Sequence, residues 1–537
     1  MKKLSKLMFL SFLLLTGCSN KTSSDVNSTT TSSSSNSSSQ TPSSSSVVSS
    51  KIEAPEYEGD IKFDGYYKAT KQSITYADSR KSSYYNHDLN AIGDQKVLVV
   101  PVKFKDSTLA DTTYGGSDLV KSHIEKGFFG NEEETGWESL SSYYKKSSYG
   151  KLNISGKVTD WCELDLTYLE SEALNTNGIK GTDGVQTHST VQIARMVGKW
   201  YLENYDDASE FDLDNDGYID LLWMIYDWTS ENKGENDWAH VYWDSYNRVE
   251  GTATDPIPFT FAWAGISFLY EGQYYDENNN ALVDAHTIIH ETGHALGLTD
   301  YYDYGGKTSY AGGLDMMDVN IGDHTGLSKY LLGWTDPYVV TGDCEITLRP
   351  FEQTGDFILI KDEWNHSAND EYLLVEFYTP TGLNKLDSES PYANKYPIHY
   401  QNPGIKVYHV DARLGHYVNF QFNGYTDEIK GLNDGYTNCT LQAHSNTASR
   451  RLPKTPEYEL YHLLENVKNP ILHTGRNFAD DNSLFHEGDI FDPYDFEFCF
   501  DEHELFNDGE YIDFAFEVIS MNENETTLKF TRISEAI

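Results

Sequence analysis

The run HETGHALGLTD at residues 290–300 contains two histidines four positions apart, with a glutamate directly after the first. On a helix, His290 and His294 leave the same face, so their imidazoles can bind one ion. Glu291 lies beside them on the helical wheel, where its carboxylate can take a proton from water without binding the metal. Two nitrogen ligands, a third ligand, an open position and a proton acceptor make a hydrolytic zinc site. The run therefore predicts a zinc hydrolase with Glu291 as general base.

The end of this predicted helix decides the third ligand. Gly297 can adopt the left-handed backbone conformation that ends a helix, and the turn that follows would bring Asp300 to the metal. Asp303 and His324 are the alternatives. Glu345, the next glutamate along the chain, lies in a run that predicts a strand, which disfavours a ligand on a second helix. A plain amphipathic helix with two histidines one turn apart is the structural alternative, and the added glycine and aspartate weaken it.

A second motif, GGLDMMD, follows at residues 312–318. A methionine in a tight turn beneath the metal is typical of zinc proteases whose metal-binding helix ends at a glycine. Met317 is the favoured candidate and Met316 the alternative, although a core methionine near a turn would give the same pattern. Three tyrosines near the two motifs are candidates for stabilising the oxyanion that forms during peptide hydrolysis: Tyr301, Tyr302 and Tyr310.

Residues 211–220 (FDLDNDGYID) place possible oxygen ligands at alternate positions. Positions one, three and five of a calcium loop would be acidic, a glycine supplies the turn at position six, and a backbone carbonyl would be the seventh ligand. Position twelve is Trp223 and not glutamate, so the loop runs into a strand and another ligand must close the site. We predict a structural Ca²⁺ site in preference to a plain acidic turn. Its ligand residues would be Asp212, Asp214, Asp216, Tyr218 and Asp220.

In these motifs the chain resembles the immune inhibitor A family of secreted bacterial metallopeptidases. The blocks that carry the resemblance are residues 290–303, 312–318, 326–334, 141–152, 211–220, 371–377 and 404–411. The resemblance implies a metzincin-like catalytic domain with one zinc ion, calcium stabilisation and protein substrates. By position, it makes His290, His294 and Asp300 the zinc ligands and Glu291 the base. Leu314 stands where the family often has tryptophan.

The first 18 residues have the pattern of a bacterial lipoprotein signal. Three lysines within the first six residues precede an apolar run from Leu7 to Leu15, and the run LTGC ends at Cys18. Cleavage before Cys18 would leave a lipidated cysteine, and the alternative is a non-lipidated secretory signal. Residues 19–50 are nearly all Ser, Thr and Asn, which predicts a disordered tether. We therefore expect an exported protein, anchored to the membrane at the bacterial cell surface through Cys18.

The formal net charge of −44 argues against nucleic acid and anionic lipid as partners that bind by general electrostatics. We expect a solvated acidic surface, bound Ca²⁺, extracellular protein or peptide substrates, and a monomer. The cysteines after Cys18 are widely spaced, which disfavours a metal cluster and allows one or two disulfides. These cysteines are Cys162, Cys344, Cys439 and Cys499.

The remaining patterns predict an α+β fold. Residues 97–104 and 151–158 predict strands, residues 138–147 and 187–205 predict helices, and residues 265–270 predict a strand just before the metal-binding helix. The expected boundaries are a signal peptide over 1–17, a tether over 18–52, a lead-in segment over 53–94, a zincin catalytic domain over 95–343 and a β-rich region over 344–537.

The β-rich region ends in two predicted strands, residues 511–518 and 527–530, which are typical of a sandwich-like module. Such a module could bind glycan or substrate, and bracing the catalytic domain is the favoured role. The sequence thus predicts a twisted sheet with an active-site helix, followed by this module, in a cell-surface lipoprotein zinc endopeptidase. The alternatives are a non-catalytic adhesin or glycan-binding lipoprotein on a protease-like scaffold, and a zinc hydrolase of non-peptide substrates.

Overall fold

A computed structural model of the chain describes residues 59–72, 88–176, 189–205, 207–229, 238–244, 251–418, 421–425, 439–443, 445–447, 458–496 and 506–533. The chain divides into two units, residues 1–55 and 56–537, and all described residues belong to the second. The predicted signal peptide, Cys18 and the tether lie outside the described residues. Within the described part, no helix has the length and apolarity needed to cross a membrane.

The first sheet is built on β3 (Gly93–Lys103), which is buried from Val97 to Val102. The strand order is β4-β3-β7-β10-β8, and β5 pairs with β3 beside this path. The other bounds are β4 (Leu152–Val158), β5 (Cys162–Glu163), β7 (Leu222–Tyr226), β8 (His240–Trp243) and β10 (Thr260–Gly265). Strands β4, β3, β7 and β10 run parallel, whereas β8 pairs antiparallel with β10 at the end of this order.

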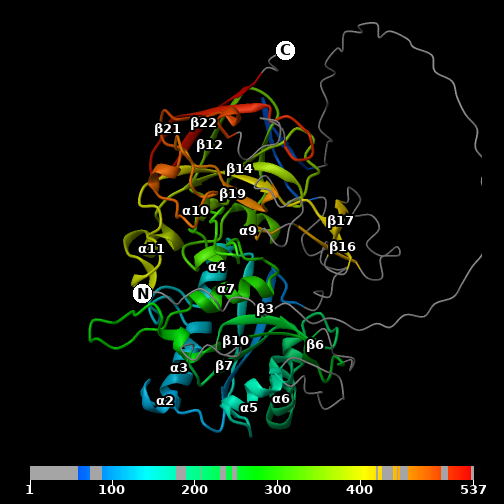
Figure 1. Ribbon diagram of the computed structural model, residues 1–537, viewed down its shortest axis with the longest axis vertical. Coiled ribbons are helices and arrows are strands. Elements are labelled where there is room, and N and C mark those ends of the chain that lie inside the picture. Colours follow the sequence, from blue (N-terminus) through cyan, green and yellow to red (C-terminus); the bar gives the residue numbers. More distant parts are fainter. Residues whose placement is uncertain are drawn as a thin grey trace, which may run out of the picture. The chain divides into compact units, whose positions relative to one another are not determined.

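Helices cover both faces of this sheet (Figure 1). Their bounds are α3 (Ser117–Phe129), α4 (Leu140–Ser147), α5 (Tyr168–Thr176), α6 (Ser189–Tyr205) and α7 (His286–Ala295). Because side chains alternate along a strand, Val97 and Val99 of β3 enter one core with α3, α4 and α7. Leu98 and Val100 enter another core with α5 and α6. The helix predicted from the histidine spacing is α7.

The strand predicted over residues 265–270 is wrong. Strand β10 ends at Gly265, and η3 (Ile266–Tyr270) is a 3₁₀-helix. Phe268 and Leu269 are buried in the same core as α7. An apolar run of this length does not distinguish a strand from a buried helical turn, and here packing of these side chains beside α7 favours the turn.

A second sheet of seven strands has the order β1-β2-β11-β13-β14-β15-β19, and a four-stranded sheet has the order β12-β22-β21-β20. The bounds of the seven are β1 (Ile61–Lys62), β2 (Tyr66–Lys68), β11 (Tyr338–Val340), β13 (Phe357–Ile360), β14 (Glu371–Tyr378), β15 (Gly404–Asp411) and β19 (Tyr461–Leu463). The bounds of the four are β12 (Cys344–Leu348), β20 (Ile490–Phe491), β21 (Phe514–Met521) and β22 (Thr526–Arg532). The predicted terminal strand pair is therefore β21 and β22, which pair antiparallel.

The seven-stranded sheet lies between two cores. Leu359 and Leu374 on one face join the core that contains α7. Leu373 and Val375 on the other face pack with Phe516 of β21 and the rest of the four-stranded sheet. Figure 1 shows α4, α7 and α9 (Gly326–Leu331) between the strands β3, β7 and β10 below and the strand β14 above. Helix α7 thus belongs to a core that contains residues of β3 from the first sheet and of β13 and β14 from the second.

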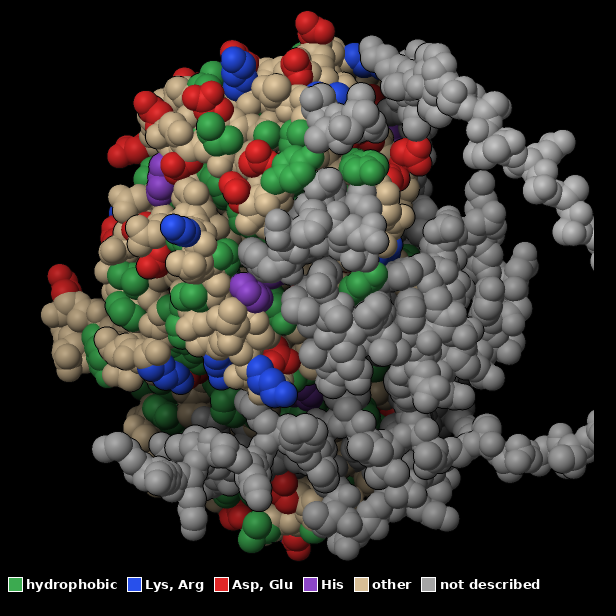
Figure 2. All heavy atoms as spheres, turned by 45° about the horizontal axis from the view of Figure 1, so that its top comes forward, with side chains coloured by type: hydrophobic (Ala, Val, Ile, Leu, Met, Phe, Trp, Pro, Cys, Tyr) green, Lys and Arg blue, Asp and Glu red, His purple; other side chains and the backbone are tan. Residues whose placement is uncertain are grey.

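The remaining described elements are short. They are α2 (Leu109–Thr112), α8 (Met316–Val319), α9 (Gly326–Leu331), α10 (Phe351–Thr354), α11 (Lys385–Glu389), β6 (Tyr218–Ile219), β9 (Ile257–Pro258), β16 (Gly415–Val418), β17 (Gln421–Tyr425), β18 (Cys439–Gln442), η1 (Ser209–Phe211), η4 (Gly382–Asn384), η5 (Tyr392–Asn394), η9 (Asp481–Ser483) and η10 (Pro493–Phe496). Cys162 and Cys344 carry free thiols, and Cys499 lies outside the described residues. On the face drawn in Figure 2, Asp and Glu side chains lie scattered over the described surface.

Candidate metal centre

Helix α7 carries both motif histidines and ends as the sequence predicts. Its last residue is Ala295, and Gly297 has a φ of 107°, a backbone conformation that favours glycine. The backbone N–H of Leu298 donates to the carbonyl of Gly293 at 2.9 Å, which closes the turn. The chain then reverses, so that Asp300 returns to the face of α7 from which the histidines project.

Three ligand atoms meet at this turn. Oδ1 of Asp300 lies 3.1 Å from Nε2 of His290 and 3.2 Å from Nε2 of His294. A tetrahedral zinc site with metal–ligand distances of about 2.0–2.1 Å separates its ligand atoms by about 3.3 Å. The two measured distances are close to this spacing, and all three atoms lie within 4.8 Å of one another. Their types, two imidazoles and a carboxylate, are those that zinc prefers.

The other ring nitrogen of each histidine is held by a backbone carbonyl. Nδ1 of His290 donates to the Met316 carbonyl at 2.7 Å, and Nδ1 of His294 donates to the Leu298 carbonyl at 2.9 Å. A proton held on Nδ1 leaves Nε2 with a free lone pair, which is the state that a metal ligand needs. Both imidazoles are thus oriented by backbone carbonyls, with Nε2 of each ring directed toward Asp300.

Electrostatics at the site follow from burial and mutual contact. Burial raises the pKa of the Asp300 carboxyl, but His294 and His290 outweigh it and hold that pKa well below its usual range. Burial lowers the pKa of His294, while the Asp300 carboxylate outweighs it and raises that pKa to about 9. Asp300 is therefore ionised, and a metal ion that bound between it and His294 would take the place of the proton on the imidazole Nε2.

Glu291 is buried on α7 between the two histidines in sequence. Its Oε2 atom is buried and has no hydrogen-bond partner among the described residues. An ionisable oxygen left unpaired in a buried place is costly unless a ligand or water completes it. Glu291 is therefore available to exchange a proton with a molecule bound beside the histidines.

Two tyrosines approach Asp300, and sequence reasoning missed one of them. Tyr304 donates its hydroxyl hydrogen to Oδ2 of Asp300. Tyr302 packs against Tyr304, and burial together with the charges of Asp300 and Glu291 raises the pKa of its phenol well above the usual value. Of the three predicted candidates, Tyr302 thus lies beside the site. Tyr301 contacts the Ser328 hydroxyl, and Tyr310 packs on His462.

The structure does not bring the alternative third ligands into this group. The Asp303 carboxylate accepts the backbone N–H groups of Gly305 and Lys307, both at 3.0 Å, as an ordinary turn residue does. The His324 ring is buried against Tyr143, with ring centres 5.6 Å apart. His240, on β8, is an exposed residue within electrostatic reach of Glu291; no sequence motif pointed to it.

Both candidate methionines lie beneath α7. Met316 provides the carbonyl that holds His290, whereas the side chain of Met317 packs under Gly293. A Cβ atom on Gly293 would lie 2.6 Å from Sδ of Met317. The two neighbouring methionines therefore support α7 through different atoms. Met316 does so through its backbone carbonyl and Met317 through its sulfur.

The amino-terminal end of α7 is held by a charged cluster around His286. Asp284 contacts Nδ1 of His286 at 2.7 Å, and Asp387 of α11 lies 3.6 Å from Nε2. The rings of Trp137 and Tyr392 both stack on the imidazole of His286, with ring centres 4.2 and 4.1 Å from its own. Burial lowers the pKa of His286, but the two carboxylates outweigh it and raise that pKa to about 9.

The acidic loop lies apart from this centre, before β6. Three of its residues offer carboxylate oxygens within 4.8 Å of one another: Asp212, Asp214 and Asp216. Gly217 has a φ of 94° and turns the chain there, and Tyr218 begins β6. Burial, with the neighbouring aspartates, raises the pKa of Asp220 to about 8. The loop therefore gathers like charges that a cation would neutralise.

Comparison with known proteins identifies the part of the chain that holds this centre. Residues 85–326 match the family model described as immune inhibitor A peptidase M6, catalytic domain. The chain is 26% identical over 260 residues to immune inhibitor A of Bacillus thuringiensis subsp. alesti, a match that covers 43% of this chain and 36% of that protein. It is 25% identical over 266 residues to pre-pro-metalloprotease PrtV of Vibrio cholerae serotype O1, which covers 43% of this chain and 27% of that protein. The chain spans about a third of the length of these curated relatives.

Proposed function

We propose that this chain, whose residues 85–326 form a metallopeptidase catalytic domain of the immune inhibitor A family, is an exported zinc endopeptidase that hydrolyses peptide bonds of extracellular proteins. One observation carries the proposal. Ligand atoms of His290, His294 and Asp300 lie within 4.8 Å of one another, and Glu291, next to His290 on α7, has a buried carboxylate oxygen with no hydrogen-bond partner in the part of the chain that the structure describes. Such a combination serves hydrolysis and has no evident use in a purely structural core.

The chain's own residues divide the chemistry among them. His290, His294 and Asp300 would hold the zinc, and when bound the ion polarises water and the substrate carbonyl. Glu291 would accept the proton of the attacking water and return it to the leaving amine. Tyr302 would donate a hydrogen bond to the developing oxyanion, since its raised phenol pKa keeps it protonated.

The same features support a metzincin-like catalytic domain. Helix α7 ends before a glycine with positive φ, the third ligand follows three residues later, and a buried methionine pair lies under the helix. In this proposal Met317 is the methionine of the turn. A structural Ca²⁺ ion would be bound by the loop described above, where it would neutralise the carboxylates of Asp212, Asp214 and Asp216.

The region after the catalytic domain is proposed to brace it as a sandwich-like module, and the core that joins β14 to β21 supports this role. The protein would be exported and held at the bacterial surface through Cys18, which rests on the lipoprotein pattern of the first 18 residues. It would act as a monomer.

The decisive experiment compares casein cleavage by the purified protein and its Glu291→Gln variant in zinc and calcium. Glutamine keeps the size of the side chain and removes its basicity. We expect cleavage to fall by at least about 100-fold while the bound zinc, measured by elemental analysis, is retained. Glu345→Gln, at the next glutamate along the chain and in β12, is the matched control and should cleave as the wild type does.

Two outcomes would contradict the proposal. Full activity of Glu291→Gln would show that Glu291 is not the base. Zinc binding by the wild type without cleavage of casein or of a broad peptide library would favour a non-catalytic surface protein on this scaffold.

A further inference from the structure

The carbonyl that holds His290 belongs to the first residue of α8, near one end of a loop segment, residues 315–326, that runs through α8 to the start of α9. Met316 supplies this carbonyl, and the side chain of Asp315 accepts two backbone N–H groups from the two ends of the loop, Met317 at 2.6 Å and Thr325 at 3.1 Å. Because Asp315 is fully buried, neither bond competes with water. The position of the Met316 carbonyl therefore depends on where Thr325 lies.

The far end of this loop is held by side chains from well beyond residue 326. Three of its backbone N–H groups donate to them: Gly322 to Asp387 at 2.8 Å, Asp323 to Asn384 at 2.9 Å, and Gly326 to Glu376 at 2.8 Å. All six groups are buried, so an amide that lost its acceptor would stay unpaired. Hydrogen bonds thus join the loop to the metal-binding helix at one end and to the later part of the chain at the other.

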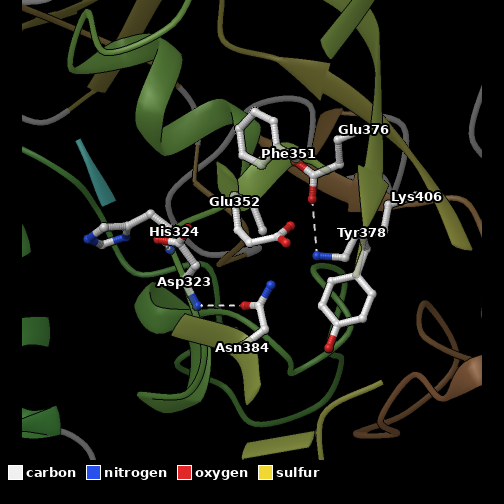
Figure 3. A pocket seen from close by; sticks show the side chains of 9 residues that line it. Asp323, His324, Phe351, Glu352, Glu376, Tyr378, Asn384 and Lys406 are labelled. Carbon is white, nitrogen blue, oxygen red and sulfur yellow. Dashed lines mark hydrogen bonds and ion pairs between the residues drawn. The ribbon is translucent and has the colours of Figure 1, made fainter. Parts of the chain in front are cut away.

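Glu376 holds its place through a buried ion pair across two strands. Its neighbour opposite on β15 is Lys406, and Nζ of Lys406 lies 3.0 Å from Oε1 of Glu376, with both side chains at least 96% buried. Figure 3 shows the Glu376 carboxylate pointing at this nitrogen. The nitrogen lies over the ring of Tyr378. Oε1 thus serves the lysine and Oε2 serves the amide of Gly326, so the carboxylate has one orientation.

Side chains of β14 lie close to the backbone of the loop at Gly326. A Cβ atom on Gly326 would lie 2.8 Å from the Leu374 side chain and 3.0 Å from Oε2 of Glu376, so a larger residue would push the strand away. The charge of Lys406 also acts on Asp315, whose pKa burial raises to about 6 while Lys406 is among the groups that lower it. The ion pair and Asp315 therefore belong to one connected polar cluster.

We propose that Glu376 is a positioning residue of the zinc site, which acts through the Gly326 amide and Asp315 to fix the Met316 carbonyl that orients His290. The inference rests on the proposed function only in taking His290 as a zinc ligand. It makes the seven-stranded sheet a part of the metal centre and not only a brace, since a residue of β14 would set the geometry of a ligand on α7.

Zinc affinity, measured by competition with a chromophoric chelator, tests this inference without any substrate. Glu376→Ala removes the acceptor of the Gly326 amide, and we expect zinc binding about tenfold weaker. Glu376→Gln keeps an oxygen for that amide and should restore most of the affinity. Glu376→Ala combined with Lys406→Met leaves no buried unpaired charge, so it is the variant to use if the single change prevents folding.

The matched control is Lys361→Met, directly after β13 in the same sheet. Lys361 is also buried and paired, with Asp508 and with Glu510 at 3.2 Å. These partners lie between Phe506 and Ile512, which pack in the core shared with the four-stranded sheet and not in the core of α7. We expect a loss of stability with zinc affinity unchanged. Equal zinc affinity in wild type and folded Glu376→Ala, or an equal loss in Lys361→Met, would overturn the inference.

A second measurement uses the wild type alone. Zinc should slow amide hydrogen exchange in residues 315–326 and also in β14, because both are coupled to His290. Protection confined to α7 and the turn at Asp300 would overturn the inference. If this inference is wrong but the proposed function is right, the wild type still shows Glu291-dependent cleavage. If the proposed function is wrong, the wild type cleaves nothing, and the zinc affinities of the variants can still be compared.

Discussion

Gly293→Ala is the substitution that most directly probes the packing beneath the active-site helix. The new Cβ would lie 2.6 Å from Sδ of Met317 and 3.3 Å from the hydroxyl oxygen of Tyr144. An ordinary contact between such atoms is about 3.8 Å, so the sulfur or the helix must move by about 1 Å. Met317 is fully buried and the interior around it is close-packed, so this shift reaches the neighbouring Met316 carbonyl.

Two stability effects oppose each other in this variant. Alanine within a helix is favoured over glycine by about 1 kcal/mol, and overpacking a filled core costs about 1–3 kcal/mol. The free energy of unfolding should therefore fall by only about 0–2 kcal/mol, and the variant should fold. Catalysis is more sensitive, because a displacement of about 1 Å in a catalytic group can reduce the rate by about 100-fold. We expect kcat to fall between about 10- and 100-fold.

The assay is steady-state cleavage of a fluorogenic peptide selected from casein digests, with urea unfolding of the same samples. Met317→Ala supplies the missing space, so Gly293→Ala should cost less in that background than in the wild type, which a double-mutant cycle measures. A wild-type kcat for Gly293→Ala, or strict additivity of the two changes, would show that the 2.6 Å contact does not disturb the site.

Three further predictions concern the surroundings of the site. Tyr304→Phe removes the charge-assisted hydrogen bond to Asp300, so zinc affinity should fall about tenfold in chelator competition; unchanged affinity would mean that the bond does not orient the ligand. Lys329→Met leaves the buried carboxylate of Asp323 without its cation, and urea unfolding should report a loss of about 3–5 kcal/mol, partly recovered when Asp323→Asn is added. His286 has a folded pKa raised from 6.5 to about 9, so its contribution of about 3 kcal/mol is complete below pH 6.5 and is lost as the pH rises through 9. A pH series of unfolding free energies should show this decline in the wild type and a flatter profile in His286→Gln, and parallel profiles would contradict it.

The elements with a strong local pattern could be predicted from the sequence. The helix expected over residues 187–205 is α6 and the strand expected over 97–104 is β3, because both carry an apolar periodicity that only one kind of element can bury. The expected strand at 265–270 failed because a short apolar run has no such periodicity. Its 3₁₀ conformation depends on packing beside α7, which no local pattern encodes.

The common face of His290 and His294 and the turn at Gly297 follow from local sequence, since they depend on helix geometry and backbone freedom within a few residues. The choice of Asp300 over Asp303 and His324 as the residue that meets the two histidines needed the folded chain, because the path of a loop depends on its distant contacts.

The tertiary structure also supplied what holds the ligands. The carbonyl of Met316 and the carboxylate of Glu376 have no signature in the residue types around His290, because every residue carries a carbonyl and Glu376 lies far along the chain. Residue identity specifies which groups can bind a metal. Their orientation is set by long-range packing and buried hydrogen bonds, which form only when the two large sheets meet around α7.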